Sequence, residues 1–264
     1  MTGKPLIDFQ KITVRKDGKT ILDNVGLTVG PQEHIAVVGP NGSGKSSLIK
    51  VMTREYYPVA APGVVKRIMG KELWNVTDLR KALGIVTTDL QNTCLRDISV
   101  TDTVISGFFS SIGLYDNHAV SPEMRQKAAS ALESLGIAHL KDRLMTEIST
   151  GEARKVLIAR ALVHDPEALV LDEPTNSLDM KAIAMFRETL SVLSGAHNII
   201  LVTHDLSDII PEIGRVILIR DGRIFADGKK EEILTSEKLS ALFDVPVAVE
   251  KHGKYYSSRL IADG

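Results

Sequence analysis

The stretch that decides the fold is Gly39-Pro40-Asn41-Gly42-Ser43-Gly44-Lys45-Ser46. It has the pattern G-x-x-x-x-G-K-[ST], whose glycines allow backbone N–H groups to turn inward around phosphate oxygens. Before it, the apolar residues 34–38 are typical of a buried strand in a parallel sheet. After it, residues 46–54 have helical character, so a bound phosphate would meet the positive end of a helix. The sequence therefore predicts a strand–loop–helix unit that binds phosphate.

Within this loop we expect Lys45 to reach the β- and γ-phosphates of a nucleotide and Ser46 to ligate Mg²⁺. A plain glycine-rich turn is the alternative interpretation, and the flanking strand and helix favour phosphate binding over it. The residues expected to contact the nucleotide here are Gly39, Pro40, Asn41, Gly42, Ser43, Gly44, Lys45, Ser46 and Ser47.

Two carboxylates, Asp172 and Glu173, follow a second apolar run at residues 168–171. Paired acids rarely end a buried strand unless a cation or a reaction uses them. We expect Asp172 to hold Mg²⁺, directly or through water, and Glu173 to polarise an attacking water molecule. A helix cap after the strand is the alternative interpretation of the pair.

His204 follows a third apolar run, residues 199–203. Ligands of parallel α/β sheets bind at the carboxyl ends of the strands. A lone histidine at such a place is more often structural. The phosphate loop and the paired carboxylates on other strands favour a contact of His204 with the γ-phosphate and the attacking water.

Residues 149–152, Ser-Thr-Gly-Glu, open a predicted helix that continues through residues 153–162. Ser149 and Glu152 have the spacing of a capping box, which is an adequate structural explanation by itself. A capped helix start that contains a glycine is also an anion site. It could receive a phosphate from outside its own subunit.

The remaining pattern is that of a mixed α/β chain. Apolar strands that alternate with a helix at about residues 181–193 favour a parallel sheet. Further strands are expected at residues 6–9, 12–15 and 21–29, a mainly helical stretch at about 90–145 with a helix at 124–136, a hairpin at 215–227, and a last segment, 229–264, with a helical start and a polar end.

Composition bounds the class of protein. The chain has 264 residues, 44% hydrophobic and 25% charged, with a net charge of -1, as in ordinary soluble globular proteins. We expect no nucleic-acid partner from this balance. The single Cys94 excludes an intramolecular disulfide and fits a reducing compartment. Neither a signal peptide nor a membrane-spanning run is evident, so we expect a cytoplasmic chain whose spanning part, if any, is another polypeptide.

Together these motifs resemble the nucleotide-binding domain of ABC ATPases over nearly the whole chain. The order and the separations of the motifs match as well as their residues. The segments that carry the resemblance are the Walker A loop (39–46), the signature motif (149–152), Walker B with the catalytic glutamate (169–173), the D-loop (177–179) and the switch histidine, His204.

The resemblance implies a P-loop NTPase fold, with a RecA-like parallel sheet core, an N-terminal antiparallel β subdomain and an inserted helical subdomain. A single domain would span residues 1–264. Its core would comprise about 1–88 and 154–232, its helical subdomain about 89–153, and its C-terminal extension about 233–264.

The resemblance also implies Mg²⁺-dependent hydrolysis of ATP, with Glu173, His204 and Lys45 as catalytic residues. Two such domains would pair head to tail, as a homodimer or with a second ABC subunit. Each ATP would then lie against the partner's signature residues, Ser149, Thr150, Gly151 and Glu152. A separate transmembrane permease would hold the dimer at the inner face of the cell membrane.

This sequence departs from the family pattern at several positions. Thr150 replaces the usual first glycine of the signature, and Glu152 stands where glutamine is common. The adenine-stacking aromatic is missing from residues 14–16, so we expect Arg15 to stack on the base and GTP and ATP to turn over comparably. Gln91, slightly later than usual, is assigned to Mg²⁺ and to the transmembrane-side contact.

Two functions compete at this level: the ATPase subunit of a transporter, favoured as an importer, and a soluble ABC ATPase acting on another macromolecule. A nucleotide-binding module without hydrolysis is disfavoured by Glu173 and His204. Residues 91–144 would face a membrane partner, and Phe108, Phe109 and Ile112 are candidates there for a docking patch or for core. Residues 221–243 are similar to ATPases of metal-chelate importers, and the late glutamine to molybdate-related cassettes.

Overall fold

The computed structural model of the chain describes residues 4–261, which form two compact units. The first unit joins the described residues up to Val76 with those from Asn198 onward, and the second is Thr77–His197. Residues 1–3 and 262–264 of the expected domain lie outside the described residues. The second unit is larger than the expected helical subdomain because strands and a further helix group with it, and the core and helical boundaries stay a prediction.

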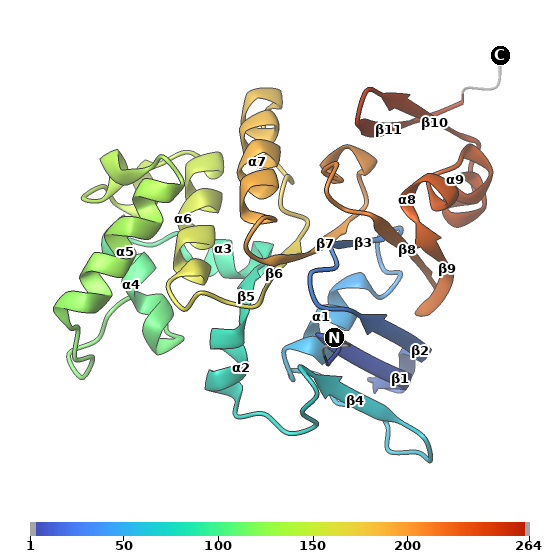
Figure 1. The fold of residues 1–264 in the computed structure, drawn as a ribbon, viewed down its shortest axis with the longest axis horizontal. Coiled ribbons are helices and arrows are strands. Elements are labelled where there is room, and N and C mark those ends of the chain that lie inside the picture. Colours follow the sequence, from blue (N-terminus) through green and yellow to red (C-terminus); the bar gives the residue numbers. More distant parts are fainter. Residues whose placement is uncertain (1–3, 262–264) are drawn as a thin grey trace. The chain divides into compact units, whose positions relative to one another are not determined.

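The N-terminal part of the first unit is a three-stranded antiparallel sheet (Figure 1). Strand β1 (Ile7–Lys16) lies between β2 (Lys19–Val29) and β4 (Val65–Ile68). The β1–β2 turn falls at Asp17-Gly18, and both residues have positive φ. The antiparallel β subdomain is thereby confirmed, although β4 was not anticipated from its four partly polar residues.

A second sheet region in the same unit is built on apolar strands. Strand β3 (Ile35–Val38) pairs in parallel with β7 (Asn198–Thr203) on one side and β8 (Arg215–Arg220) on the other. Strand β9 (Arg223–Lys229) returns antiparallel to β8. Every residue of β3 and β7 is buried, which explains their uninterrupted apolar sequence. The predicted parallel α/β architecture is confirmed.

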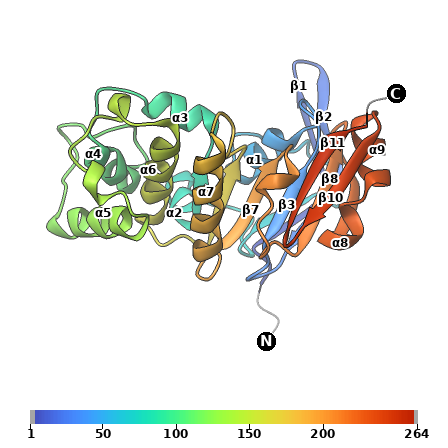
Figure 2. The same cartoon turned by 90° about the horizontal axis from the view of Figure 1, so that it is seen from above.

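The C-terminal part of this unit follows β9 with two short helices and a hairpin (Figure 2). They are α8 (Lys230–Ile233), α9 (Ser236–Phe243), β10 (Val247–His252) and β11 (Tyr255–Leu260). The helical start expected from the sequence is confirmed. The hairpin was not anticipated, because only Val247 and Tyr256 of its strands are buried and the sequence therefore shows no continuous apolar face.

The second unit contains a parallel strand pair and most of the helices. Strand β5 (Leu83–Val86) pairs with β6 (Ala168–Asp172), and Val86 lies opposite Leu171. The elements before, between and after these strands are mainly helical, as predicted. They are α2 (Val76–Ala82), α3 (Thr88–Cys94), α4 (Val100–Ile105), η1 (Ser106–Phe109), α5 (Pro122–Ser134), η2 (Ala138–Leu140), η3 (Met145–Glu147), α6 (Thr150–Leu162) and α7 (Met180–Leu193).

Helix α5 shows why these segments are helical. The Ser121 hydroxyl accepts the N–H of Met124 at 3.2 Å, and Pro122 occupies the first turn. The helix ends at Ser134, before Gly136, whose φ of 68° few other residues adopt. Start and stop therefore follow the local sequence, and α4, α5 and α6 pack against one another (Figure 2).

Candidate nucleotide-binding site

The loop between β3 and α1 (Lys45–Met52) has the backbone that its glycines predict. Gly42 and Gly44 have φ of 79° and 107°, a region that residues with a side chain rarely adopt. Gly44 precedes the first residue of α1, and its carbonyl accepts the N–H of Leu48 at 2.9 Å. The loop thus delivers its backbone N–H groups to the start of a helix, as phosphate binding requires.

Position 39 requires glycine because of the atoms around it rather than because of its backbone dihedral angles. A Cβ atom there would lie 2.2 Å from the carbonyl oxygen of Ile219 and 2.7 Å from Ser43 Oγ. The β8–β9 turn is tied to the loop from the same side, because the N–H of Gly222 donates to the Ser43 carbonyl at 2.9 Å. Backbone from three segments therefore encloses the loop and leaves no room for a side chain.

Lys45 lies across this loop and is only 5% exposed. Its ammonium donates to the carbonyls of Gly39 at 2.7 Å and Pro40 at 3.1 Å. The Ser43 hydroxyl is buried and has no hydrogen-bond partner among the described residues. A buried hydroxyl without a partner and a lysine ammonium in one glycine-rich loop at a helix start fit a phosphate, whose oxygens would accept from both.

His204 is brought to the same strand edge as the loop. Strands β3 and β7 run in parallel with Val38 opposite Thr203, so Gly39 and His204 are the next residues of neighbouring strands. The turn is fixed because the Thr203 hydroxyl donates to the buried Asp208 carboxylate at 2.6 Å. His204 itself is exposed, as a contact with a γ-phosphate would need.

Arg15, the expected partner of the base, is exposed near the end of β1. An aromatic residue that the sequence reasoning missed lies close by. The ammonium of Lys16 donates to the Tyr56 hydroxyl at 3.3 Å, and that of Lys50 is 5.5 Å from the Tyr56 ring centroid. The separation of 40 residues between Lys16 and Tyr56 hid this contact. The position of a tyrosine four residues after the end of the phosphate-loop helix was the only hint in the sequence itself, and it does not indicate the contact with Lys16.

In the second unit, Asp172 is the last residue of β6 and Glu173 follows it. Glu173 has a φ of 48°, which costs a residue with a side chain about 1 kcal/mol or more. The pairing of Val86 with Leu171 brings the start of α3 to the same edge as Asp172.

Gln91 lies one turn into α3, and Thr87 caps that helix by accepting the N–H of Leu90 at 3.1 Å. Its side chain is 4% exposed, and Oε1 has no hydrogen-bond partner among the described residues. Oxygen is the ligand atom that Mg²⁺ prefers. A buried amide oxygen without a partner therefore fits the metal role expected of Gln91.

The signature segment forms a capping box at the start of α6. The Ser149 N–H and hydroxyl both donate to the Glu152 carboxylate, at 2.8 and 2.7 Å, and the Glu152 N–H donates back to the hydroxyl at 3.3 Å. The Ser149 hydroxyl, then its backbone N–H, hold the pKa of Glu152 below its usual value. The capping box is confirmed, and Thr150 is the first helical residue, where no glycine is required.

Gly151 is the close-packed residue of that segment. A Cβ there would lie 3.2 Å from Ala182 Cβ and 3.8 Å from Leu178. Leu178 belongs to the expected D-loop, in which Ser177 has a φ of 66° and Asp179 caps α7 by accepting the N–H of Ala182 at 2.7 Å. The signature helix and the D-loop are therefore in contact within this unit.

Arg154, on α6, was not singled out from the sequence. It is 1% exposed, and its Nε and Nη1 atoms have no hydrogen-bond partner among the described residues. Burial lowers its pKa to about 10, and the charge of Asp172 opposes this shift. Its place in a capped amphipathic helix gave no sign of burial, because arginine is usually exposed.

The aromatic residues considered for docking are half-buried. The Phe108 ring meets His164 edge-on at 5.1 Å, and Phe109 stacks on His118 at 4.1 Å between centroids. Burial lowers the pKa of His164. Histidines thus cover both rings in part, so the docking and core roles of Phe108, Phe109 and Ile112 both stay open predictions.

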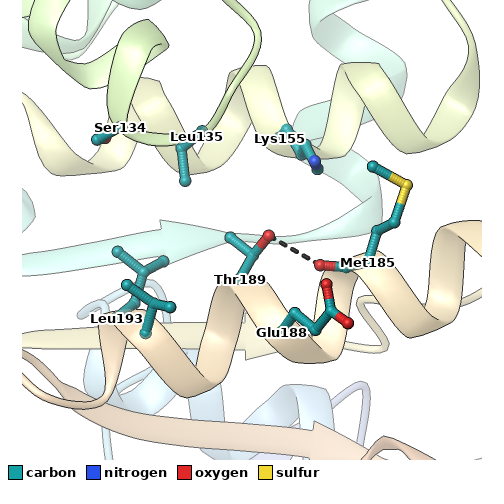
Figure 3. Close-up of a pocket in the computed structure, with 8 residues that line it drawn as sticks. Ser134, Leu135, Lys155, Met185, Glu188, Thr189 and Leu193 are labelled. Atoms are coloured by element: carbon teal, nitrogen blue, oxygen red, sulfur yellow. Dashed lines mark hydrogen bonds between the residues drawn. The ribbon is translucent and has the colours of Figure 1, made fainter.

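A separate groove of about 210 Å³ lies between the end of α5 and the helices α6 and α7 (Figure 3). Among the described residues that line it, Lys155 and Glu188 are the charged ones. The Thr189 hydroxyl donates a hydrogen bond to the Met185 carbonyl at 2.9 Å. The rest of the lining is Ser134, Leu135, Val192 and Leu193. No residue expected to contact nucleotide lines this groove.

Comparison with known proteins decides the family. The sequence profile of the family described as ABC transporter matches residues 22–176, which run from β2 through the phosphate loop and the signature to beyond Glu173. The chain belongs to the ABC transporter family. The resemblance inferred from its motifs is confirmed.

Relatives in this family are alike over nearly the whole chain. An uncharacterised ABC transporter ATP-binding protein of Bacillus subtilis, YlmA, is 33% identical over 250 residues, 92% of this chain and 93% of that protein. The hemin import ATP-binding protein HmuV of Nitrobacter winogradskyi is 29% identical over 259 residues, 95% of this chain and 92% of that protein.

Solved structures agree with the fold. CbiO1 of Clostridium perfringens, part of an ABC transporter complex, matches with a TM-score of 0.76 and 26% identity over 90% of this chain and 94% of that one. An ATP-binding cassette in its ADP conformation matches with a TM-score of 0.77 at 24% identity over 91% of this chain and 98% of that one.

This chain is accordingly an ATP-binding, ATP-hydrolysing subunit of an ABC transporter, and the soluble alternative is disfavoured. The fold is that of a P-loop NTPase, as predicted. Among residues 4–261, no helix is both long enough and apolar enough to span a bilayer.

Proposed function

We propose that this ABC ATPase binds Mg²⁺–ATP through its phosphate loop, pairs with a second copy around two nucleotides, and drives a separate membrane subunit. The observation that carries the proposal is the loop itself. Gly39 is enclosed by backbone, Gly44 has a left-handed conformation, Lys45 is buried with its ammonium on the loop carbonyls, and the buried Ser43 hydroxyl has no partner among the described residues.

Each residue has a chemical task in this proposal. Lys45 and the loop N–H groups hold the β- and γ-phosphates, and His204 contacts the γ-phosphate from the neighbouring strand. Glu173 orients and polarises the attacking water. Ser46, Gln91 and Asp172 are the oxygen donors for Mg²⁺, which when bound neutralises charge that develops on the phosphates.

The second copy is needed for the signature segment. The capping box uses the Ser149 hydroxyl and the N–H groups of Ser149 and Glu152, so the N–H groups of Thr150 and Gly151 in this first turn would be the donors to an anion from elsewhere. A head-to-tail pair closed by two-fold symmetry places one such turn at each ATP. ATP would then favour the closed pair because it contacts both copies, and loss of the γ-phosphate would release them.

We place the assembly at the inner face of the cell membrane, peripheral to a permease and without a nucleic-acid partner. Our hypothesis is that the transporter is an importer and that its substrate is a metal chelate. The name of HmuV, a hemin import protein that is alike over nearly its full length, supports it, as does the similarity of residues 221–243 to metal-chelate importers.

Glu173→Gln tests the chemistry. It keeps the shape of the side chain and removes its charge, so ATP binding should persist while hydrolysis falls at least about 100-fold. Because ATP is then not consumed, size-exclusion chromatography with Mg²⁺–ATP should show a stable dimer.

The matched control is Glu188→Gln, an exposed glutamate on α7. It should hydrolyse ATP at the wild-type rate and form no trapped dimer. A Glu173→Gln protein that turns over normally would remove Glu173 from the mechanism, and one that binds ATP without dimerising would remove the second copy.

A further inference from the structure

Tyr56 stands in an unusual setting within the first unit. Its ring is half-buried, and two ammonium groups reach it from different elements. Lys16, the last residue of β1, donates to its hydroxyl at 3.3 Å and lies 5.7 Å from its centroid, and Lys50 of α1 lies 5.5 Å from the centroid. Tyr56 is held in turn because its N–H donates to the Lys50 carbonyl at 2.9 Å.

Lys50 lies on the helix that begins at the phosphate loop, and Lys16 lies on the strand that pairs with β2, a neighbour of the loop. The strand paired with β1 touches the loop directly, since a Cβ at Gly44 would lie 2.9 Å from Leu22 and 3.0 Å from the Ile21 carbonyl. Lys50 is four residues after Ser46 on α1, so the two side chains share one face of the helix. Tyr56 therefore contacts both the end of the hairpin, through Lys16, and the helix, through Lys50.

The charge of this cluster is not balanced inside the chain. Neither Lys16 nor Lys50 has an ion-pair partner within 4.0 Å in the part of the chain that the structure describes, although Asp17 adds a weaker attraction at Lys16. The Tyr56 hydroxyl raises the pKa of Lys16, so the ammonium stays charged at neutral pH. Two cations over one aromatic ring form a surface for an electron-rich planar group.

We infer that Tyr56, with Lys16 and Lys50, binds the purine base of the nucleotide whose phosphates occupy the loop. The base extends from the phosphates along the Ser46 face of α1, and the tyrosine ring offers it a stacking surface. This inference rests on the proposed nucleotide site and assigns its base-recognition residue. Arg15, at the same hairpin end, is then an accessory to the stack.

The cluster also predicts which base is accepted. The two ammonium groups only donate hydrogen bonds. Guanine presents two acceptors, O6 and N7, on the edge where adenine presents one acceptor and an amino donor. The rim of the cluster therefore gives no reason to prefer adenine, and GTP should bind at least as tightly as ATP.

A matched pair of substitutions tests the inference on the full-length protein. Tyr57 is the neighbouring tyrosine, 62% exposed, with Arg54 at 5.8 Å and Lys66 at 5.3 Å from its centroid. It has the same chemistry without Lys16 or Lys50. Isothermal titration calorimetry with Mg²⁺ would compare ATP, GTP and inorganic triphosphate on Tyr56→Ala, Tyr56→Phe and Tyr57→Ala.

Tyr56→Ala should weaken ATP and GTP about tenfold or more and leave inorganic triphosphate unchanged, because only the base contact is lost. Tyr56→Phe keeps the ring and should stay within about threefold of wild type. Tyr57→Ala should bind all three ligands as wild type does. Tyr56→Leu, which fills the same space without an aromatic face, repeats the test if the alanine variant unfolds.

Equal losses for ATP and triphosphate, or equal effects of Tyr56→Ala and Tyr57→Ala, would overturn the inference. A wild-type protein that binds ATP more than tenfold tighter than GTP would also contradict it. Failure of the proposed function looks different: wild type would bind neither ATP nor triphosphate, or Lys45→Ala would bind both normally.

Discussion

The phosphate loop, residues 39–46, and the signature segment, residues 149–152, look alike in sequence, since each joins glycine and serine to a helix start. Their structures differ. The loop holds glycines in left-handed conformations and a buried hydroxyl without a partner among the described residues, whereas the signature forms a capping box in which Ser149 and Glu152 satisfy each other. One chain thus displays a ligand site at the loop, but at the signature it displays only a stable helix end.

That difference teaches where each ligand comes from. A site that leaves buried polar groups unsatisfied can bind its ligand with the residues of one chain. A site that is satisfied alone contributes only when a second surface approaches it. The largest effects should therefore come from the loop, and the effects at the signature should separate into a stability part and an activity part.

Lys45→Ala should have the largest effect. Removing the ammonium takes away a charged donor to the phosphates, so ATP hydrolysis should fall at least about 100-fold in a phosphate-release assay. Lys181→Ala, an exposed lysine on α7, is the control and should hydrolyse normally. Retained hydrolysis in Lys45→Ala would mean that the loop is not the phosphate site.

Ser149→Ala sharpens the comparison when it is set beside Ser121→Ala. Both serines cap a helix, Ser149 that of α6 and Ser121 that of α5, so both changes should cost about 1 kcal/mol of stability. Only Ser149→Ala should also lower ATP hydrolysis, by about 10- to 100-fold. If the two variants hydrolyse ATP equally and have equal unfolding midpoints in urea, Ser149 would have no role beyond capping its helix.

Gly39→Ala and Gly151→Ala compare the two glycines. Gly39 has backbone at 2.2 Å from a new Cβ, so its substitution should lower the free energy of unfolding by about 1–3 kcal/mol. Gly151 meets a single methyl group at 3.2 Å on a helix, where alanine gains propensity, so the net change should stay within about 0.5 kcal/mol. Chemical denaturation of both variants measures this, and a reversed order would contradict the crowding at Gly39.

Glu152→Gln should have the smallest effect. Glutamine can close the same capping box, so at pH 7 stability should change by less than about 0.5 kcal/mol. The folded state lowers the pKa of Glu152, so its carboxylate stabilises the fold at neutral pH and this contribution is lost as the pH falls through the folded pKa. The difference from wild type should therefore vanish in acid, and a difference that grows there would have the wrong sign.

The sequence predicted the core of the fold because its strong signals are local. Strands β3, β6 and β7 are unbroken apolar runs, and α5 carries its cap and stop within its own residues. Strand β4 and the β10–β11 hairpin were missed because they are short and partly exposed. Their stability comes from pairing with segments distant in sequence or from the turn that joins them.

The residues of the site also divide into those with a local sequence signal and those without one. Gly39, Glu173 and His204 could be assigned from the sequence because each directly follows a strand that the sequence predicts. Tyr56 and Arg154 were missed because their significance depends on residues far along the chain, the lysine at position 16 and the carboxylate of Asp172. Long-range contacts of this kind leave no periodic pattern to read.

The most direct test of the account mixes two inactive variants, Lys45→Ala and Ser149→Arg, and measures ATP hydrolysis. If each ATP lies between the loop of one copy and the signature of the other, a mixed dimer has one site with both defects and one intact site. Random pairing should then restore about a quarter of the wild-type rate. No recovery on mixing, with each variant folded, would show that the signature does not complete the site of a second copy.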